Sequence, residues 1–345
     1  MQLALYAPAL GYYTAGATKL GGAGDFVTAP ELSSLFSQTL AQQVGEILSV
    51  TGGDVLELGA GSGRMAGDML QALAVRGSLP GRYLILEVSG DLAARQQQRL
   101  RALAPELASR VAWIDRMPDA IRGVIVCNEV LDAQPTHLIR WSEGEIHERG
   151  VVWSGGAFAW NDRAPIEPAL LAQARGLDPP APYLSEINRI GPALVGTLAR
   201  VLERGALLLV DYGFGEREYY HPQRSQGTLM CHFRHRAHDN PFFLPGLQDI
   251  TSHVDFSAVT RAATDTGLEL LGYTTQAMFL INLGITDLMA LTPAEDTAAY
   301  LPLAAQAQKL LSPAEMGELF KVIALGRGID CALSGFRRGD MSRLL

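Results

Sequence analysis

Residues 54–70, which read DVLELGAGSGRMAGDML, decide the fold. The apolar run from Asp54 to Leu58 is typical of a strand, and the segment from residue 64 onward has the spacing of a helix. A glycine turn between a strand and a helix lets backbone amides approach a ligand closely, and the helix N-terminus favours an anionic group. This stretch therefore predicts a ligand-binding loop at residues 57–63.

Two features of the loop favour S-adenosylmethionine over a nicotinamide dinucleotide. Glu57 precedes the glycines, where it can take the amino group of a methionine moiety, and Gly63 comes one residue earlier than the dinucleotide pattern requires. Glu87 ends the next expected strand, where an acid binds ribose hydroxyls. We expect Glu57, Gly59, Gly61, Gly63 and Glu87 to bind the cofactor, and a tight turn without a ligand is the alternative.

Strand-like and helix-like segments alternate along the first part of the chain, which predicts an α/β fold with a Rossmann-like parallel sheet. Short alternating runs in residues 136–165, separated by Gly-Gly and Glu-Gly turns, predict an antiparallel insertion. The expected parts are an N-terminal loop and helical segment covering the site (1–50), a cofactor-binding core (51–135), the antiparallel insertion (136–190) and the remainder of the core (191–345) with a long active-site loop (214–256).

The fourth expected strand is followed by NEVLDAQP, residues 128–135. Because the carboxyl ends of parallel strands face the binding crevice, Asn128, Glu129 and Asp132 are expected beside the cofactor. Asn128 is assigned to cofactor binding. The paired carboxylates of Glu129 and Asp132 suit a cationic acceptor, and a planar guanidinium suits them best. Capping of a helix is the alternative for Asp132.

Three further sets of residues are weaker candidates. Asp115 follows the third expected strand, where it could contact the adenine amine, and an ordinary loop aspartate is equally supported. His253 lies in a polar segment and is assigned as a catalytic acid or base, with a structural histidine as the alternative. Cys231, His232, His235 and His238 match no standard zinc spacing, so we expect no metal.

Composition excludes some classes of protein. The formal net charge of −8 and the lack of a strong Lys/Arg run make nucleic acid a weak candidate for a partner. The three cysteines are far apart and no apolar run reaches the length of a membrane span, so neither a disulfide framework nor a membrane span is expected. We expect a cytoplasmic protein, or a mitochondrial-matrix one in a eukaryote, and a homodimer stays open.

The chain resembles the MidA/NDUFAF7 family of class I methyltransferases. The resemblance covers nearly the whole chain, through LYAPALGYY, LELGAGSGRMAGDML, NEVLDAQP, LLLVDYG and the segment that ends in DITSHVDF. It implies that the cofactor loop falls on residues 57–63, the ribose acid on Glu87 and the Asn-Glu-x-x-Asp segment on Asn128, Glu129 and Asp132. It also implies a protein-arginine methyltransferase that dimethylates an arginine symmetrically on the 49-kDa subunit of respiratory complex I, during assembly of that complex.

The sequence therefore predicts an S-adenosylmethionine-dependent methyltransferase, with a protein arginine as the expected acceptor. Two rival hypotheses remain at this level. One is a cofactor-binding assembly factor that works by contact without catalysis, and the other is an enzyme that methylates a small molecule. The long segment 214–256 and the separate insertion favour a large acceptor, because a small one needs only a closed pocket.

Overall fold

The computed structural model describes residues 1–14, 27–164 and 167–345. Its central sheet has the strand order β14-β15-β9-β4-β1-β2-β3, in which β1, β2, β3, β4 and β9 are parallel and β15 is antiparallel to both neighbours. The α/β, Rossmann-like prediction is therefore confirmed. The strands are β1 (Asp54–Leu58), β2 (Tyr83–Leu86), β3 (Val111–Ile114), β4 (Ile121–Asn128), β9 (Leu202–Phe214), β14 (Glu269–Thr275) and β15 (Phe320–Arg327).

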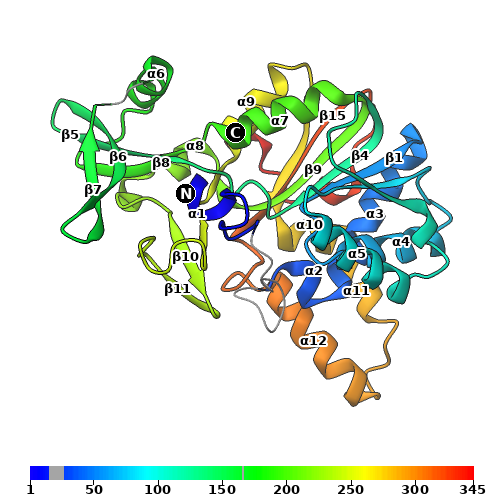
Figure 1. Ribbon diagram of the computed structural model, residues 1–345. Helices are drawn as coiled ribbons and strands as arrows, with labels where there is room; N and C mark the ends of the chain where they lie inside the picture. The colour runs from blue at the N-terminus through cyan, green and yellow to red at the C-terminus, as the bar shows by residue number, and fades with distance from the viewer. Residues whose placement is uncertain (15–26, 165–166) are drawn as a thin grey trace.

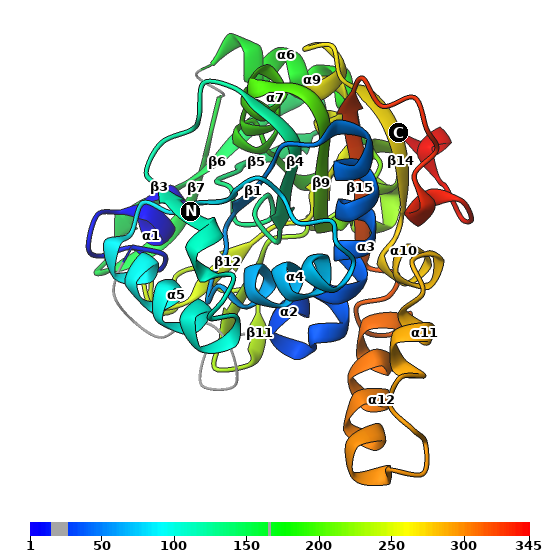
Figure 2. The same cartoon turned by 90° about the vertical axis from the view of Figure 1, so that its right-hand side faces the viewer.

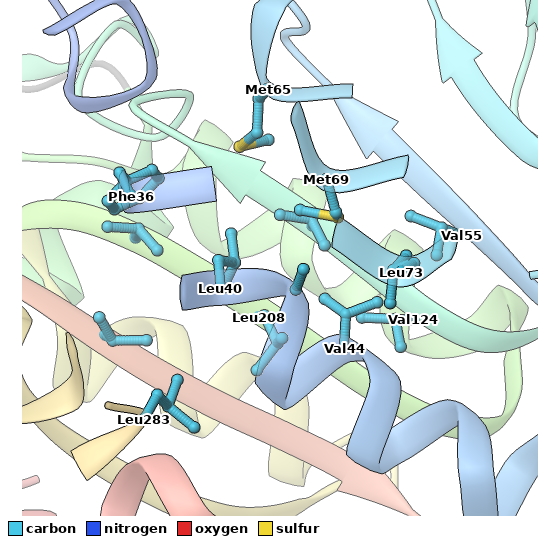
Figure 3. Close-up of a cluster of buried hydrophobic side chains, with 14 of the residues drawn as sticks. Phe36, Leu40, Val44, Val55, Met65, Met69, Leu73, Val124, Leu208 and Leu283 are labelled. Carbon is cyan, nitrogen blue, oxygen red and sulfur yellow. The ribbon is translucent and has the colours of Figure 1, made fainter. Parts of the chain in front are cut away.

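The inner strands are mostly apolar along their middle residues because helices cover both faces of the sheet. Figure 1 shows α3 (Ser34–Thr51) and α4 (Arg64–Val75) on one side, and α7 (Ile190–Val201) and α9 (Phe256–Thr264) on the other. Alternate residues of β9 accordingly join two separate cores. In the first core, side chains from α3 and α4 pack over β1, β4 and β9 (Figure 3), among them Phe36, Leu40, Val44, Met65, Met69, Leu73, Val55, Val124 and Leu208. Helix α5 (Gly90–Leu103) packs beside α4.

The predicted antiparallel insertion forms a second sheet with the order β7-β6-β5-β8. Its strands are β5 (His137–Ser142), β6 (Glu145–Ser154), β7 (Ala157–Arg163) and β8 (Tyr183–Ile187). Helix α6 (Pro168–Leu177) covers one face, where its apolar residues form a small core with Ile139, Trp141 and Tyr183. Figure 1 shows this sheet on the opposite side of the molecule from α3 and α4.

The expectation of a long loop at 214–256 is wrong. The segment contains α8 (Glu216–Tyr219), a 3-10 turn (Pro222–Arg224) and a three-stranded sheet of order β11-β10-β12. The strands are β10 (Met230–Phe233), β11 (Arg236–His238) and β12 (Asp249–Thr251), and β13 (Val254–Asp255) pairs with β9. Strands of two to four residues are too short to show a period of two in the sequence, which is why the pattern was missed.

Other differences lie near the two ends of the chain. The loop expected from Leu5 to Pro30 overlaps α1 (Gln2–Tyr6) and α2 (Ala29–Leu32), and residues 15–26 lie outside the described residues. Between β14 and β15 the chain forms three helices that the sequence reading did not assign: α10 (Gln276–Asn282), α11 (Ile285–Met289) and α12 (Thr297–Leu311). Figure 2 shows α11 and α12 projecting from the body of the molecule. Further 3-10 turns lie at Ala108–Arg110, Ser334–Phe336 and Ser342–Leu344.

Glycines stand where the backbones of strands β1, β4 and β9 approach one another closely. Gly123 pairs with Asp54 on one side and Gly205 on the other. A Cβ on Gly123 would lie 2.1 Å from the carbonyl oxygen of Asp54, and the residue has a φ of +124°. Both the close approach and the backbone conformation therefore require glycine.

Substitution Gly123→Ala should lower the free energy of unfolding by about 3 kcal/mol or more, because overpacking adds to backbone strain. Gly155→Ala is the matched control, since Gly155 also has a positive φ (+60°) but no atom lies within 4 Å of its added Cβ. Urea denaturation of both variants measures the difference. Equal losses for the two would contradict the close approach between β1 and β4.

Candidate functional site

A cavity of about 1520 Å³ lies where the carboxyl ends of β1, β2, β4 and β9 meet. Parallel strands end at the same edge of the sheet, so residues far apart in sequence come together there. Among the expected site residues, those that line the cavity are Glu57, Gly59, Gly61, Glu87, Asn128, Glu129, Asp132 and His253. The cavity is larger than most small-ligand sites, which span about 300–1,000 Å³, so it has room for a cofactor and for an acceptor group.

The glycine loop has the backbone that its sequence predicts. Gly59, Gly61 and Gly63 all have positive φ angles of +69°, +54° and +80°. A Cβ on Gly59 would lie 2.6 Å from Cγ2 of Val130, and a Cβ on Gly63 would lie 3.3 Å from Gln96. Gly63 is the N-cap residue of α4 and is not among the cavity-lining residues. The loop is therefore held close to its neighbours and exposes backbone to the cavity.

Glu57 is fully buried at the base of the loop. The Tyr83 hydroxyl donates a hydrogen bond of 2.6 Å to its Oε2, while Oε1 has no partner among the described residues. Burial raises the pKa of the Glu57 carboxyl to about 7. A buried carboxylate oxygen without a donor is costly unless a ligand supplies one, so the site fits the amino group of a methionine moiety.

Glu87 is connected to the glycine loop through Gln96, a residue that the sequence reading did not single out. Oε1 of Glu87 accepts from the backbone N–H of Ser89 at 2.8 Å, and Oε2 accepts from Nε2 of Gln96 at 3.1 Å. The same Gln96 amide donates to the carbonyl oxygen of Gly61 at 3.0 Å. Each carboxylate oxygen keeps a further lone pair, so Glu87 can still accept the two hydroxyls of a ribose.

Asn128 lines the cavity, whereas Asp115 does not. Asn128 lies in the cavity wall, where its Nδ2 donates to Oε1 of Glu129 at 3.1 Å and its Oδ1 has no partner in the described chain. Asp115 is exposed and does not line the cavity. It follows β3, the edge strand, which lies two strands from β1. The structure therefore does not bring Asp115 to the site.

Glu129 occupies a strained position directly after β4. It has a φ of +52°, and its backbone N–H donates to the carbonyl oxygen of Val210 at 2.9 Å. Burial, followed by the charge of Asp132, raises the pKa of the Glu129 carboxyl to about 8, although Asn128 and the backbone of Ala29 hydrogen-bond to it. A non-glycine residue is held in this conformation only where its surroundings fix it, which is common at functional sites.

Asp132 is buried beside Glu129. The Tyr212 hydroxyl donates to its Oδ2 at 2.6 Å, whereas its Oδ1 accepts no hydrogen bond from the described residues. Burial raises the pKa of Asp132 to about 6 despite the Tyr212 hydrogen bond. The helix-capping alternative is wrong, because no helix begins here and the next element is strand β5. Instead, Oδ2 of Asp211 accepts from the N–H groups of Leu131 and Asp132 at 2.9 and 3.3 Å and fixes this turn.

His253 lines the cavity beside the end of β9. Its backbone N–H donates to Oγ1 of Thr228 at 3.0 Å, and its ring contacts the rings of Tyr212 and Phe214. Burial, and then the charges of Arg224 and Lys321, lower the pKa of the imidazole to about 4. At neutral pH the ring is therefore uncharged, and Glu129 is the stronger proton acceptor of the two.

Other parts of the cavity wall are held by residues that belong to no local sequence motif. Glu31 of α2 accepts from the Ser62 hydroxyl of the glycine loop and from Nη2 of Arg99 at 3.3 Å, which connects α2 to the cofactor loop. The buried carboxylate of Glu186 in β8 accepts from the N–H of the cavity-lining Thr228 at 3.0 Å and from its hydroxyl at 2.9 Å. Only the folded chain brings these pairs together, because their members lie 31 and 42 positions apart in the sequence.

The Cys/His segment lies on β10, β11 and the turn between them, and Cys231 and His238 pair across the two strands. No group of three or more His, Cys, Asp and Glu side chains in the described residues is arranged to hold a metal ion. Within the same residues, none of the helices has the length and apolar content that a membrane crossing requires.

The fold and the site together define a class I S-adenosylmethionine-dependent methyltransferase. A family model described as "Putative S-adenosyl-L-methionine-dependent methyltransferase" matches residues 37–274, and the chain belongs to this family. The chain is 50% identical to a protein from Burkholderia thailandensis, described as a "likely methyl transferase", whose crystal structure contains S-adenosyl-homocysteine. The two superpose with a TM-score of 0.97 over 100% of this chain and 90% of that one.

The chain is also similar to curated eukaryotic proteins. It is 28% identical to "Protein arginine methyltransferase NDUFAF7, mitochondrial" of Danio rerio, over 94% of this chain and 82% of that protein. The protein of the same name from Homo sapiens is 27% identical over 94% of this chain and 78% of its own length. The resemblance to the MidA/NDUFAF7 family is therefore confirmed, as are the methyltransferase activity and the cofactor, S-adenosylmethionine.

Replacing Glu87 tests the ribose contact. Glu87→Ala should weaken binding of S-adenosylmethionine and S-adenosylhomocysteine together, about tenfold or more, because a hydrogen bond to a charged group contributes roughly 1.5–3 kcal/mol. Isothermal titration calorimetry measures both affinities. Asp115→Ala, at the end of the next strand, is the matched control and should bind like the wild type. A larger loss for Asp115→Ala would mean that the adenosine lies elsewhere.

Proposed function

We propose that this methyltransferase transfers a methyl group to an arginine side chain of a protein, and that the acceptor is the 49-kDa-type subunit of respiratory complex I. The names of the eukaryotic relatives support arginine as the acceptor residue. The observation that carries the proposal is that Glu129 and Asp132 share one cavity with the glycine loop. The identity of the acceptor protein rests on the family resemblance.

The electrostatics of the pair favour a cationic acceptor. Two buried carboxyls with raised pKa values disfavour their own ionisation, and a cation placed between them would reverse that cost. A guanidinium is the cation that best matches two carboxylates, because it is planar and donates several parallel hydrogen bonds. The Tyr212 hydroxyl fixes Oδ2 of Asp132, which leaves Oδ1 for such a ligand.

The chain's own groups can position the acceptor and remove its proton. The bound cofactor supplies a methyl group on a positively charged sulfur. Glu129 would orient the guanidinium and accept a proton during or after transfer, since a free guanidinium keeps its proton to above about pH 12. Asp132 would hold a second edge of the guanidinium. Neutral His253 would form hydrogen bonds to the ligand without taking its proton, because its lowered pKa makes it a weak base.

Glu129→Gln is the central test of this proposal. The amide keeps the shape but removes the charge and the proton acceptor, so methyl transfer should fall about a hundredfold or more while cofactor affinity and folding are retained. Transfer of tritiated methyl groups to the 49-kDa-type subunit measures the rate. Asp132→Asn should lose less, because an amide oxygen can still accept the hydrogen bond from Tyr212.

The same variant separates catalysis from a role by contact. A strain deleted for the gene should not recover complex I assembly when it carries Glu129→Gln, if methyl transfer is the function. Full complementation by the inactive protein would instead favour an assembly factor without catalysis. A wild-type enzyme that labels no protein at all would favour a small-molecule acceptor.

The pH dependence follows from the pKa of Glu129. A carboxyl with a raised pKa is uncharged below that pKa, so both the attraction for a cation and the proton-accepting ability are lost as the pH falls. The value of kcat/KM for the acceptor should therefore rise with pH through about 8. In Asp132→Asn the midpoint should shift to lower pH, because a like charge is removed. An unchanged midpoint in that variant would mean that another group limits the reaction.

A further inference from the structure

We infer that the stacked pair of Tyr6 and Tyr13 presents an outer aromatic face that selects a guanidinium over an ammonium group at the acceptor site. The inference deepens the proposed function and rests on it, since it states how the cavity distinguishes arginine from lysine. Both tyrosines line the cavity, together with Asp132 and Asp249. Neither tyrosine belongs to the residues that the glycine loop or the strand ends would indicate.

The two rings are held in a fixed arrangement. Their centroids lie 5.6 Å apart with an interplanar angle of 24°, so the rings are stacked. Tyr12 packs edge-on against Tyr13 at 5.1 Å. The backbone N–H of Tyr13 donates to the carbonyl oxygen of Leu5 at 2.8 Å, which folds the segment after α1 back on the helix. Figure 1 shows this N-terminal segment between the insertion sheet and the main sheet.

Both hydroxyls are anchored at the acidic side of the cavity. The Tyr6 hydroxyl donates to the carbonyl oxygen of Ala133 at 3.0 Å, directly beside Asp132. The Tyr13 hydroxyl donates to Oδ1 of Asp249 at 2.8 Å. These bonds join residues 127 and 236 positions apart. Both hydroxyl hydrogens are thus used within the protein, and the tyrosines offer a ligand the ring surface that lies outside their stack.

A separate observation shows that this region is built for a donor-rich ligand. Oδ1 of Asp132 and Oδ1 of Asn128 are buried and have no hydrogen-bond partner among the described residues, although both side chains are more than nine-tenths buried. Buried acceptors without a hydrogen bond lower the stability of the folded protein unless a ligand donates to them. A guanidinium has five N–H donors in one plane, which suits several acceptors placed around a flat surface.

The aromatic pair can distinguish arginine from lysine, which the negative charge of the carboxylates alone cannot do. Asp132, Asp249 and Glu129 would attract an arginine and a lysine alike, because both carry one positive charge. A guanidinium is planar and weakly hydrated and stacks on aromatic faces, whereas an ammonium is compact and strongly hydrated. The stacked rings therefore favour arginine at a site where charge alone would not discriminate.

A structural role is the alternative for these tyrosines. Tyr6 and Tyr13 also pack around a small core that contains Leu5, Cys231 and Ile250. If packing were their whole contribution, loss of a ring would lower stability without changing which cation the protein prefers. The experiment therefore has to compare two cations on the same folded variant.

The test uses thermal unfolding of the full chain saturated with S-adenosylhomocysteine, with methylguanidinium or methylammonium chloride added at equal concentration. Methylguanidinium should raise the melting temperature of the wild type, and methylammonium should raise it less. Tyr6→Phe keeps the ring and should retain the preference. Tyr6→Leu removes the ring and should abolish it while leaving the affinity for S-adenosylhomocysteine unchanged. Tyr13→Leu is the second variant, used for the same comparison if Tyr6→Leu does not fold.

Equal shifts with the two cations in the wild type, or an unchanged preference in the folded leucine variants, would overturn the inference. The proposed function is judged by a different assay, in which tritiated methyl groups are transferred to the 49-kDa-type subunit. There, Tyr6→Leu should raise the KM for that acceptor about tenfold or more, and Tyr6→Phe should change it less than threefold. Failure of the wild type to label any arginine would defeat the proposed function, whatever the melting experiment shows.

Discussion

The proposed site depends on the burial of carboxyl groups at the carboxyl edge of a parallel sheet. Glu57 lies in β1, Glu129 and Asp132 follow β4, and Asp211 lies near the end of β9. None of the four forms an ion pair with a basic side chain in the described part of the chain. The pKa of each is raised, first by burial. Ionisation of these carboxyls is unfavourable in the protein alone and becomes favourable once cationic groups bind beside them.

Neutral donors hold these acids in place without neutralising them. The hydroxyls of Tyr83 and Tyr212 donate to Glu57 and Asp132, the Asn128 amide donates to Glu129, and backbone amides donate to Asp211. A lysine or arginine in the same places would cancel the charge that a substrate must meet. Tyrosine instead fixes one oxygen of the Glu57 and Asp132 carboxyls and leaves the other oxygen for a ligand, which is a form of preorganisation.

The outer elements complete a site that the central sheet only begins. Helix α2 reaches the glycine loop through Glu31, and the N-terminal tyrosines cover the acidic side of the cavity. Glu186, at the end of the insertion sheet, holds Thr228, and Thr228 accepts the backbone N–H of His253. Changes in the insertion can therefore affect the cavity wall through hydrogen bonds, although the insertion contributes little to the cofactor loop.

The sequence by itself predicted which residues form the cofactor half of the proposed site. Glycines after a strand, and acids at strand ends such as Glu57 and Glu87, predict a ligand site because parallel strands must end at one edge of the sheet. Only the tertiary structure placed Tyr6, Tyr13, Gln96 and Glu186, excluded Asp115, and resolved the segment 214–256 into short strands. These features depend on contacts between residues distant in sequence, and neither a local period nor a motif records which distant residues will meet.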